Sequence, residues 1–108
     1  AALNTAFAND VDGRLCFAQQ VYAYGRKGDL FLGITTSGNS ENILFAAVTA
    51  RALGMKAIGF TGQSGGKVAE IVDFCVKIPA IQTYEVQELQ QPVYHCWCQM
   101  LEEEFFRR

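Results

Sequence analysis

Three short apolar segments alternate with stretches of helical periodicity, and this alternation limits the possible fold more than any other feature. The apolar segments are residues 29–34, 55–60 and 74–78, and helical spacing of apolar residues covers 10–24, 41–53, 67–72 and 85–106. Strands that alternate with helices over short connections require right-handed crossovers and a parallel sheet. The pattern therefore predicts an α/β fold in three layers, with helices on both faces of the sheet and the strands buried on both faces.

The size of the chain allows one domain. With 108 residues, 50% of them apolar, residues 1–108 can form a single core but not two. Three strands are few for a parallel sheet and leave an apolar edge open. We therefore expect either that further N-terminal strands precede this segment in the natural protein, the interpretation we favour, or that another subunit covers the edge. The first residue is not Met, which also favours a C-terminal part of a longer chain.

Charge and cysteine content exclude several classes of protein. The formal net charge is −2 and no basic stripe occurs, which argues against a direct nucleic-acid ligand. The apolar runs are too short for a membrane span, so we expect no membrane partner. The four cysteines are scattered, which is typical of reduced core cysteines in a cytoplasmic protein. Cys96 and Cys98 lie about 200° apart on a helix and make a poor zinc pattern.

The most informative segment is the loop between the first apolar run and the second helix. Thr35, Thr36, Ser37, Gly38, Asn39 and Ser40 follow one another there. In parallel sheets, ligands bind beyond the carboxyl ends of the strands, and a helix N-terminus favours an anion. Four hydroxyl groups exceed what helix capping alone requires, although capping remains the simpler alternative. The loop therefore predicts a phosphate site.

Residues 28–40, Gly-Asp-Leu-Phe-Leu-Gly-Ile-Thr-Thr-Ser-Gly-Asn-Ser, resemble the strand and phosphosugar loop of sugar isomerase (SIS) domains. More narrowly, they are similar to bacterial phosphoheptose isomerases. The similarity continues through Thr61-Gly62-Gln63-Ser64-Gly65-Gly66-Lys67 and Val86-Gln87-Glu88, and it extends over nearly the whole chain. Thr35 is a departure, because the family usually has Ser there. The resemblance implies a flavodoxin-like SIS fold and a phosphorylated sugar as ligand.

The resemblance also implies roles for individual residues. Asn9 and Asp10 would contact the sugar, although from the residues alone they are equally well explained as a helix cap. The substrate-binding set would be Asn9, Asp10, Thr35, Thr36, Ser37, Ser40 and Gln87. Gln87 and His95 would hold a zinc ion, and His95 would alternatively transfer the proton. The turn Thr61–Lys67 is predicted mainly to reverse the chain, with phosphate contact as the weaker alternative.

The zinc prediction meets two physical difficulties. Eight residues of regular helix separate Gln87 from His95, which is about 12 Å of rise and about 80° of rotation. Pro92 lies between them and removes one helical hydrogen bond. In addition, the family's earlier loop, and the helix whose His and Glu complete the zinc site, have no counterpart in this sequence. We therefore expect the isolated chain to lack isomerase activity.

The resemblance favours an enzyme that interconverts sedoheptulose 7-phosphate and D-glycero-D-manno-heptose 7-phosphate through an enediol, assembled as a homo-oligomer (a tetramer). The apolar residues of 85–106 are consistent with assembly, although packing on the chain's own sheet explains them equally well. Two other interpretations remain open. One is a non-catalytic SIS module that senses a sugar phosphate or acts as a replication-initiator-associating adaptor; the presence of Gln87 with His95 argues against it. The other is an isomerase for a different sugar phosphate.

Overall fold

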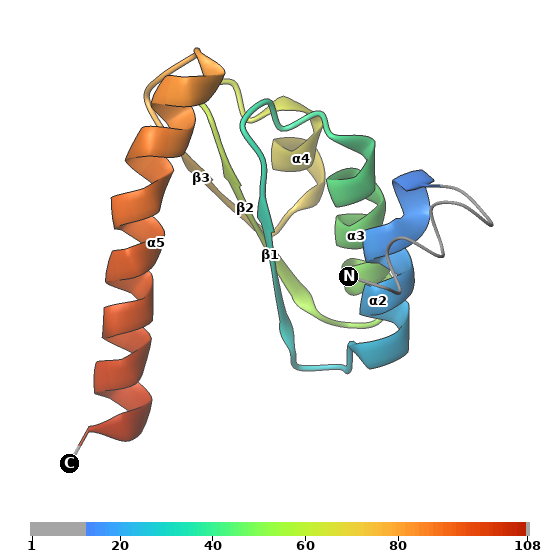
Figure 1. Ribbon diagram of the computed structural model, residues 1–108. Coiled ribbons are helices and arrows are strands. Elements are labelled where there is room, and N and C mark those ends of the chain that lie inside the picture. Colours follow the sequence, from blue (N-terminus) through green and yellow to red (C-terminus); the bar gives the residue numbers. More distant parts are fainter. Residues whose placement is uncertain (1–12, 108) are drawn as a thin grey trace.

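The computed structural model describes residues 13–107, in which a parallel sheet lies between two layers of helix (Figure 1). The strands pair in the order β1-β2-β3. They are β1 (Leu30–Ile34), β2 (Lys56–Thr61) and β3 (Phe74–Lys77). The helical elements are a 3-10 turn η1 (Gly13–Leu15), α2 (Cys16–Tyr24), α3 (Glu41–Ala52), α4 (Gly66–Ile71) and α5 (Thr83–Phe106). The predicted α/β fold is confirmed, and from β1 onward the bounds differ from the predicted ones by only one or two residues.

Small residues let two helices approach one face of the sheet closely. Helices α3 and α4 cover this face, and α2 packs against α3 (Figure 1). A Cβ atom on Gly33 would lie 2.9 Å from Ile43 of α3, and one on Gly59 would lie 2.7 Å from Val68 of α4. Close packing of this kind tolerates no added methyl group without displacement of a neighbour. The N-terminus of α3 is thereby held at the carboxyl end of β1.

On the opposite face, α5 packs on the sheet through the part of the helix that ends near Trp97. A small core there contains Phe60, Ile78, Ala80 and Val86, with Val93, Tyr94 and Trp97 packed against it. Beyond this core α5 runs away from the sheet toward the C-terminus (Figure 1). Its last apolar residues are consequently exposed, Phe105 by 73% and Phe106 by 78%. Neither α5 nor any other helix within 13–107 is long and apolar enough to cross a membrane.

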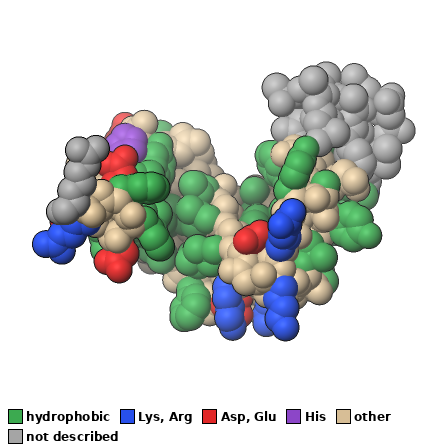
Figure 2. All heavy atoms as spheres, turned by 90° about the horizontal axis from the view of Figure 1, so that it is seen from below, with side chains coloured by type: hydrophobic (Ala, Val, Ile, Leu, Met, Phe, Trp, Pro, Cys, Tyr) green, Lys and Arg blue, Asp and Glu red, His purple; other side chains and the backbone are tan. Residues whose placement is uncertain are grey.

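The prediction that all three strands are buried on both faces is wrong for the described residues. Leu30 is 60% exposed and Phe74 is 64% exposed, although both belong to strands. Because α5 diverges, an apolar groove of about 450 Å³ opens between it and the sheet. Its lining includes Leu30, Leu32, Phe74, Val76, Trp97 and Leu101, and hydrophobic side chains gather in this hollow in Figure 2. No segment within 13–107 covers the groove.

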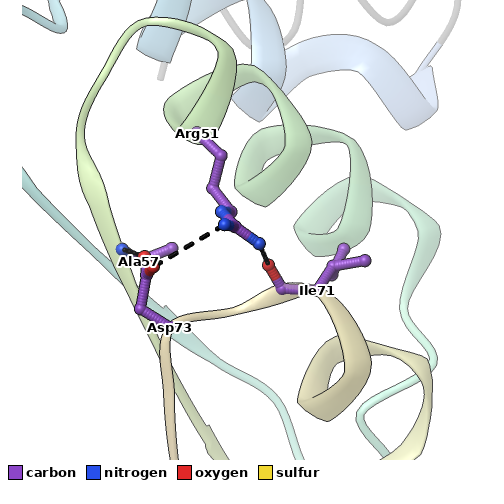
Figure 3. Close-up of polar contacts among 4 residues, drawn as sticks. All are labelled: Arg51, Ala57, Ile71 and Asp73. Atoms are coloured by element: carbon purple, nitrogen blue, oxygen red, sulfur yellow. Dashed lines mark hydrogen bonds and ion pairs between the residues drawn. The ribbon is translucent and has the colours of Figure 1, made fainter.

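Asp73 links the start of β2 to the start of β3 through hydrogen bonds (Figure 3). The Asp73 carboxylate accepts a hydrogen bond from the backbone N–H of Ala57 at 2.8 Å, and its own N–H donates to the Ala57 carbonyl at 2.8 Å. Arg51 of α3 lies 3.8 Å from the carboxylate and donates to the Ile71 carbonyl at 2.8 Å. The N–H of Ala57 in the first place, and then the charge of Arg51, lower the pKa of Asp73 below its ordinary value of 3.8.

Replacing Asp73 by Asn is expected to reduce thermal stability at neutral pH and to change it little in strong acid. Because the folded-state pKa is lowered, the ionised carboxylate stabilises the fold above pH 3.8, and this contribution disappears as pH falls through the folded-state pKa. Melting temperatures of wild type and Asp73→Asn, measured by circular dichroism from neutral pH down to about pH 2, check this expectation. Glu70→Gln on the exposed side of α4 is the control. An equal loss at both ends of the pH range contradicts the assignment.

Candidate functional site

The loop formed by residues 35–40 connects β1 to α3 and carries most of the predicted site. Its first residue, Thr35, is only 8% exposed, and its N–H donates to the Phe60 carbonyl at 3.0 Å, which extends the pairing of β1 with β2. The Thr35 and Ser40 hydroxyl oxygens lie 3.0 Å apart, so one donates to the other. Gly38 also directs its N–H toward the Thr35 hydroxyl, at 3.4 Å. The loop is therefore a closed, internally bonded turn.

The N-terminus of α3 is left open by this arrangement. Ser40 occupies the capping position, but its side chain makes no capping hydrogen bond. Within residues 13–107, the backbone N–H groups of Glu41 and Asn42 have no hydrogen-bond partner. These groups carry the positive end of the helix dipole, and an anion is the ligand that satisfies them. The simpler alternative, that the loop serves only to cap α3, therefore does not account for the Ser40 side chain.

A neighbouring arginine offsets the acidic residue at this helix end. Glu41 would repel an anion, but the Arg14 guanidinium, from η1, lies 3.0 Å from its carboxylate. Both side chains are more than half exposed, so the pair contributes little to the stability of the fold. Its effect on the site is to neutralise the Glu41 charge locally.

The glycine-rich turn 62–66 and the first residues of α4 brace the loop. The N–H of Gly62 donates to the Thr36 carbonyl at 2.9 Å, and that of Val68 donates to the Gly38 carbonyl at 2.9 Å. Lys67 donates its N–H to the Asn39 side-chain oxygen at 2.9 Å. These three N–H groups are thus bonded to the loop and are not available to a phosphate, in agreement with the predicted turn-making role. Asn39 likewise serves the loop itself.

A cavity of about 290 Å³ opens at the carboxyl end of β1. Four elements contribute to its wall, so it exists only in the folded chain. It is lined by Phe17, Ile34, Thr35, Thr36, Ser40, Asn42, Ile43, Gln87 and Gln90. Hydroxyls from the loop thereby face amide side chains from α5 across one small space. This cavity has a largely polar lining and lies at the edge of the sheet where parallel α/β folds bind ligands, whereas the larger groove under α5 is almost entirely apolar.

The fold brings four of the predicted site residues together at one cavity. Thr35, Thr36, Ser40 and Gln87 line the same cavity. Ser37 is exposed, lies outside that lining, and accepts a hydrogen bond from the Asn39 N–H at 3.0 Å. Its role as a ligand stays a prediction. Asn9 and Asp10 lie outside the residues that the structure describes.

His95 does not join Gln87 at the cavity. It is exposed on α5, with the Tyr94 ring edge-on to it at 4.9 Å between centroids. Among the described residues, no three His, Cys, Asp or Glu side chains cluster as metal ligands. Cys96 and Cys98 are exposed, so the prediction that the cysteines fill the core fails for these two. Residues 13–107 by themselves therefore do not form a zinc site.

Gln90 is the residue that sequence reasoning missed. It is 3% exposed, lines the cavity, and donates from Nε2 to the Phe60 carbonyl at 3.1 Å. One signal was available in the sequence. Gln90 lies between Val86 and Val93 on the inward stripe of α5, where a polar residue is unexpected.

Comparisons with known proteins identify the sequence and the fold. Residues 2–62 match the family model described as "SIS domain". The chain is 42% identical over 103 residues to the phosphoheptose isomerase of Aneurinibacillus thermoaerophilus. The aligned region covers 95% of the chain and 52% of that relative. Identity to phosphoheptose isomerase 2 of Campylobacter jejuni is 44% over 102 residues, covering 94% of the chain and 51% of the relative. The chain thus spans about half the length of these curated relatives.

Solved structures agree with the sequence comparisons. The structure of a phosphoheptose isomerase from Neisseria gonorrhoeae superposes with a TM-score of 0.91 at 35% identity, over 95% of this chain and 58% of that one. The structure from Francisella tularensis gives a TM-score of 0.90 at 38% identity, over 94% and 55% of the two chains. The three-stranded sheet with its helices therefore has the fold of roughly half of such an enzyme.

Proposed function

Since the chain belongs to the SIS domain family, we propose that it is the phosphosugar-binding half of a phosphoheptose isomerase, which interconverts sedoheptulose 7-phosphate and D-glycero-D-manno-heptose 7-phosphate. The observation that carries the proposal is the cavity in which Thr35, Thr36 and Ser40 face Gln87 beside an uncapped helix N-terminus. The similarity to relatives named phosphoheptose isomerase supports the choice of substrate.

The phosphate is the part of the substrate that this chain is best equipped to hold. The loop hydroxyls donate to phosphate oxygens, and the first N–H groups of α3 add neutral donors and the helix dipole. Charge-assisted hydrogen bonds of this kind are stronger than those between neutral groups. Gln87, on the opposite wall, reaches the carbon chain of the sugar with its amide. Anchoring the phosphate fixes where the reacting carbons lie, which is the larger part of what a binding half contributes to catalysis.

Proton transfer between the two reacting carbons needs groups that residues 13–107 do not bring to the cavity. The reaction requires a general base and a group that stabilises the enediol oxygen. The proposal assigns proton transfer or metal binding to His95, because an imidazole can both exchange a proton and coordinate a metal ion. Because His95 is not among the residues that line the cavity, the proposal has other segments complete the reacting centre. The described residues do not form a zinc site alone. We therefore propose only that Gln87 and His95 would each contribute one ligand to a zinc site that other segments complete.

The isolated 108-residue chain is expected to bind sedoheptulose 7-phosphate without converting it and without holding stoichiometric zinc. Isothermal titration calorimetry, a coupled turnover assay and metal analysis test the three expectations. Failure to bind overturns the phosphosugar site, whereas turnover overturns the assignment of missing catalytic groups to other segments. A protein of the relatives' full length that carries this sequence and binds the sugar phosphate without turnover favours the non-catalytic SIS sensor or adaptor.

The apolar groove leads us to propose that this cytoplasmic enzyme is a homo-oligomer, a tetramer by resemblance. Monomers seldom expose contiguous apolar patches of this kind, and α5 adds Leu101, 56% exposed, and Phe105, 73% exposed. Light scattering after size exclusion, at micromolar concentration, is expected to give a mass several times that of one chain. Leu101→Glu is expected to shift the population toward monomer. A wild-type monomer contradicts the proposal.

A further inference from the structure

Gln90 is the one polar side chain buried by α5 within its described residues, and its position on the helix is informative. The inward stripe of α5 otherwise consists of apolar side chains such as Val86, Val93 and Trp97. An amide buried among such residues costs free energy unless it is hydrogen-bonded. Gln90 satisfies this condition with one directional bond, from Nε2 to the Phe60 carbonyl at 3.1 Å.

The acceptor of that bond is shared with the phosphate loop. The Phe60 carbonyl also accepts the N–H of Thr35, the first residue of the loop, at 3.0 Å. A carbonyl oxygen has two lone pairs, and both are used here. One oxygen at the carboxyl end of β2 therefore connects α5 to the loop. Two turns later, the Trp97 ring packs on the Phe60 ring at 4.8 Å between centroids.

Gln87 lies close to this connection and lines the same cavity. It lies three residues before Gln90, so the two are neighbours on the helix surface, and both line the cavity with Thr35. The other contacts of α5 with the sheet are apolar, and such contacts are non-directional. They hold the helix against the sheet but do not fix its rotation as a hydrogen bond of defined geometry does.

We propose that Gln90 is a positioning residue for sugar recognition: its bond to the Phe60 carbonyl fixes the rotation of α5 so that Gln87 faces the sugar whose phosphate the loop holds. The inference rests on the proposed function. The inference predicts separate effects on the sugar and on the phosphate, because the loop keeps its own bond to Phe60 when Gln90 is changed. Loss of the Gln90 donor therefore affects the sugar contact and leaves the phosphate contact intact.

The test compares Gln90→Met with wild type in the 108-residue chain. Methionine keeps the length and burial of the side chain and removes the donor. Dissociation constants are measured by calorimetry for sedoheptulose 7-phosphate and for inorganic phosphate. We expect Gln90→Met to weaken sugar-phosphate binding about three- to tenfold and to leave phosphate binding within about twofold of wild type. Gln99→Met, on an exposed part of α5, is the matched control and is expected to change neither value.

The remaining outcomes decide against the inference in distinguishable ways. An equal loss for both probes makes Gln90 a residue of the fold only, and no loss for either removes any positioning role. Wild-type chain that binds neither probe overturns the proposed function, and the inference with it. Gln90→Leu is a second variant in case methionine unfolds the chain, since leucine suits the apolar surroundings and cannot donate. Wild-type affinity for sedoheptulose 7-phosphate in Gln90→Leu would also overturn the inference.

Discussion

Gly38→Ala is expected to abolish sugar-phosphate binding and to lower the free energy of unfolding by about 3 kcal/mol. A Cβ atom at Gly38 would lie 2.1 Å from the carbonyl oxygen of Gly65, and that neighbour is backbone, which cannot rotate away. Gly38 also has a φ of +75°, in the left-handed region that disfavours a side chain. To accept alanine, the loop must separate from the turn that braces it.

Separation of the loop from its brace explains why binding is lost together with stability. Gly38 accepts the N–H of Val68, and Asn39 accepts that of Lys67, so both bonds break when the loop moves. The hydroxyls of Thr35 and Ser40 then no longer converge at the N-terminus of α3. Urea unfolding gives the change in stability, and calorimetry with sedoheptulose 7-phosphate gives the change in binding.

Gly28→Ala is the matched control for this experiment. Gly28 also has a positive φ, +93°, but, apart from its two chain neighbours, no residue within 13–107 has an atom within 4 Å of the position that its Cβ would take. The control therefore carries the backbone strain without the steric overlap, and we expect it to cost about 1 kcal/mol and to leave binding unchanged. Equal losses for the two variants would show that strain alone, and not contact with the Gly65 backbone, makes Gly38 necessary.

Ser40→Ala is expected to weaken sugar-phosphate binding about ten- to hundredfold with little effect on folding. The Ser40 side chain makes no capping bond, so its removal does not uncap α3. Its hydroxyl lines the cavity and lies 3.0 Å from that of Thr35, where it can donate to a phosphate oxygen. Dissociation constants and melting temperatures of the variant and wild type provide the measurement.

Ser37→Ala provides the control within the same loop. Ser37 is exposed, lies outside the cavity lining, and bonds only locally to the Asn39 N–H. We expect its replacement to change binding by less than about threefold. A larger loss for Ser37→Ala than for Ser40→Ala would reverse the assignment and return Ser37 to the ligand set that the sequence predicts.

The elements of the fold could be predicted from the sequence alone, and so could the position of the candidate loop. Apolar runs and helical spacing are local properties of the sequence. The order of the strands and helices could therefore be predicted, and from β1 onward their bounds could be predicted to within one or two residues. The density of hydroxyls in 35–40 marked the loop, because such a cluster exceeds what capping requires. Resemblance added Gln87, which the structure brings to the same cavity.

Which of these side chains lie together could be seen only in the folded chain. Ser37 and Ser40 are equivalent in composition, yet the turn of the loop directs one to the surface and the other to the cavity. The polar residue on the inward stripe of α5 was visible in the sequence, but its hydrogen bond was not, because the acceptor, Phe60, lies 30 residues away in the chain. The exposure of the sheet face that lines the apolar groove could not be foreseen either. An apolar strand has the same kind of sequence whether its own chain or another chain covers it. The sequence pattern indicates the secondary structure that each segment favours. Contacts between distant segments depend on how the helices pack on the sheet, which the pattern does not specify.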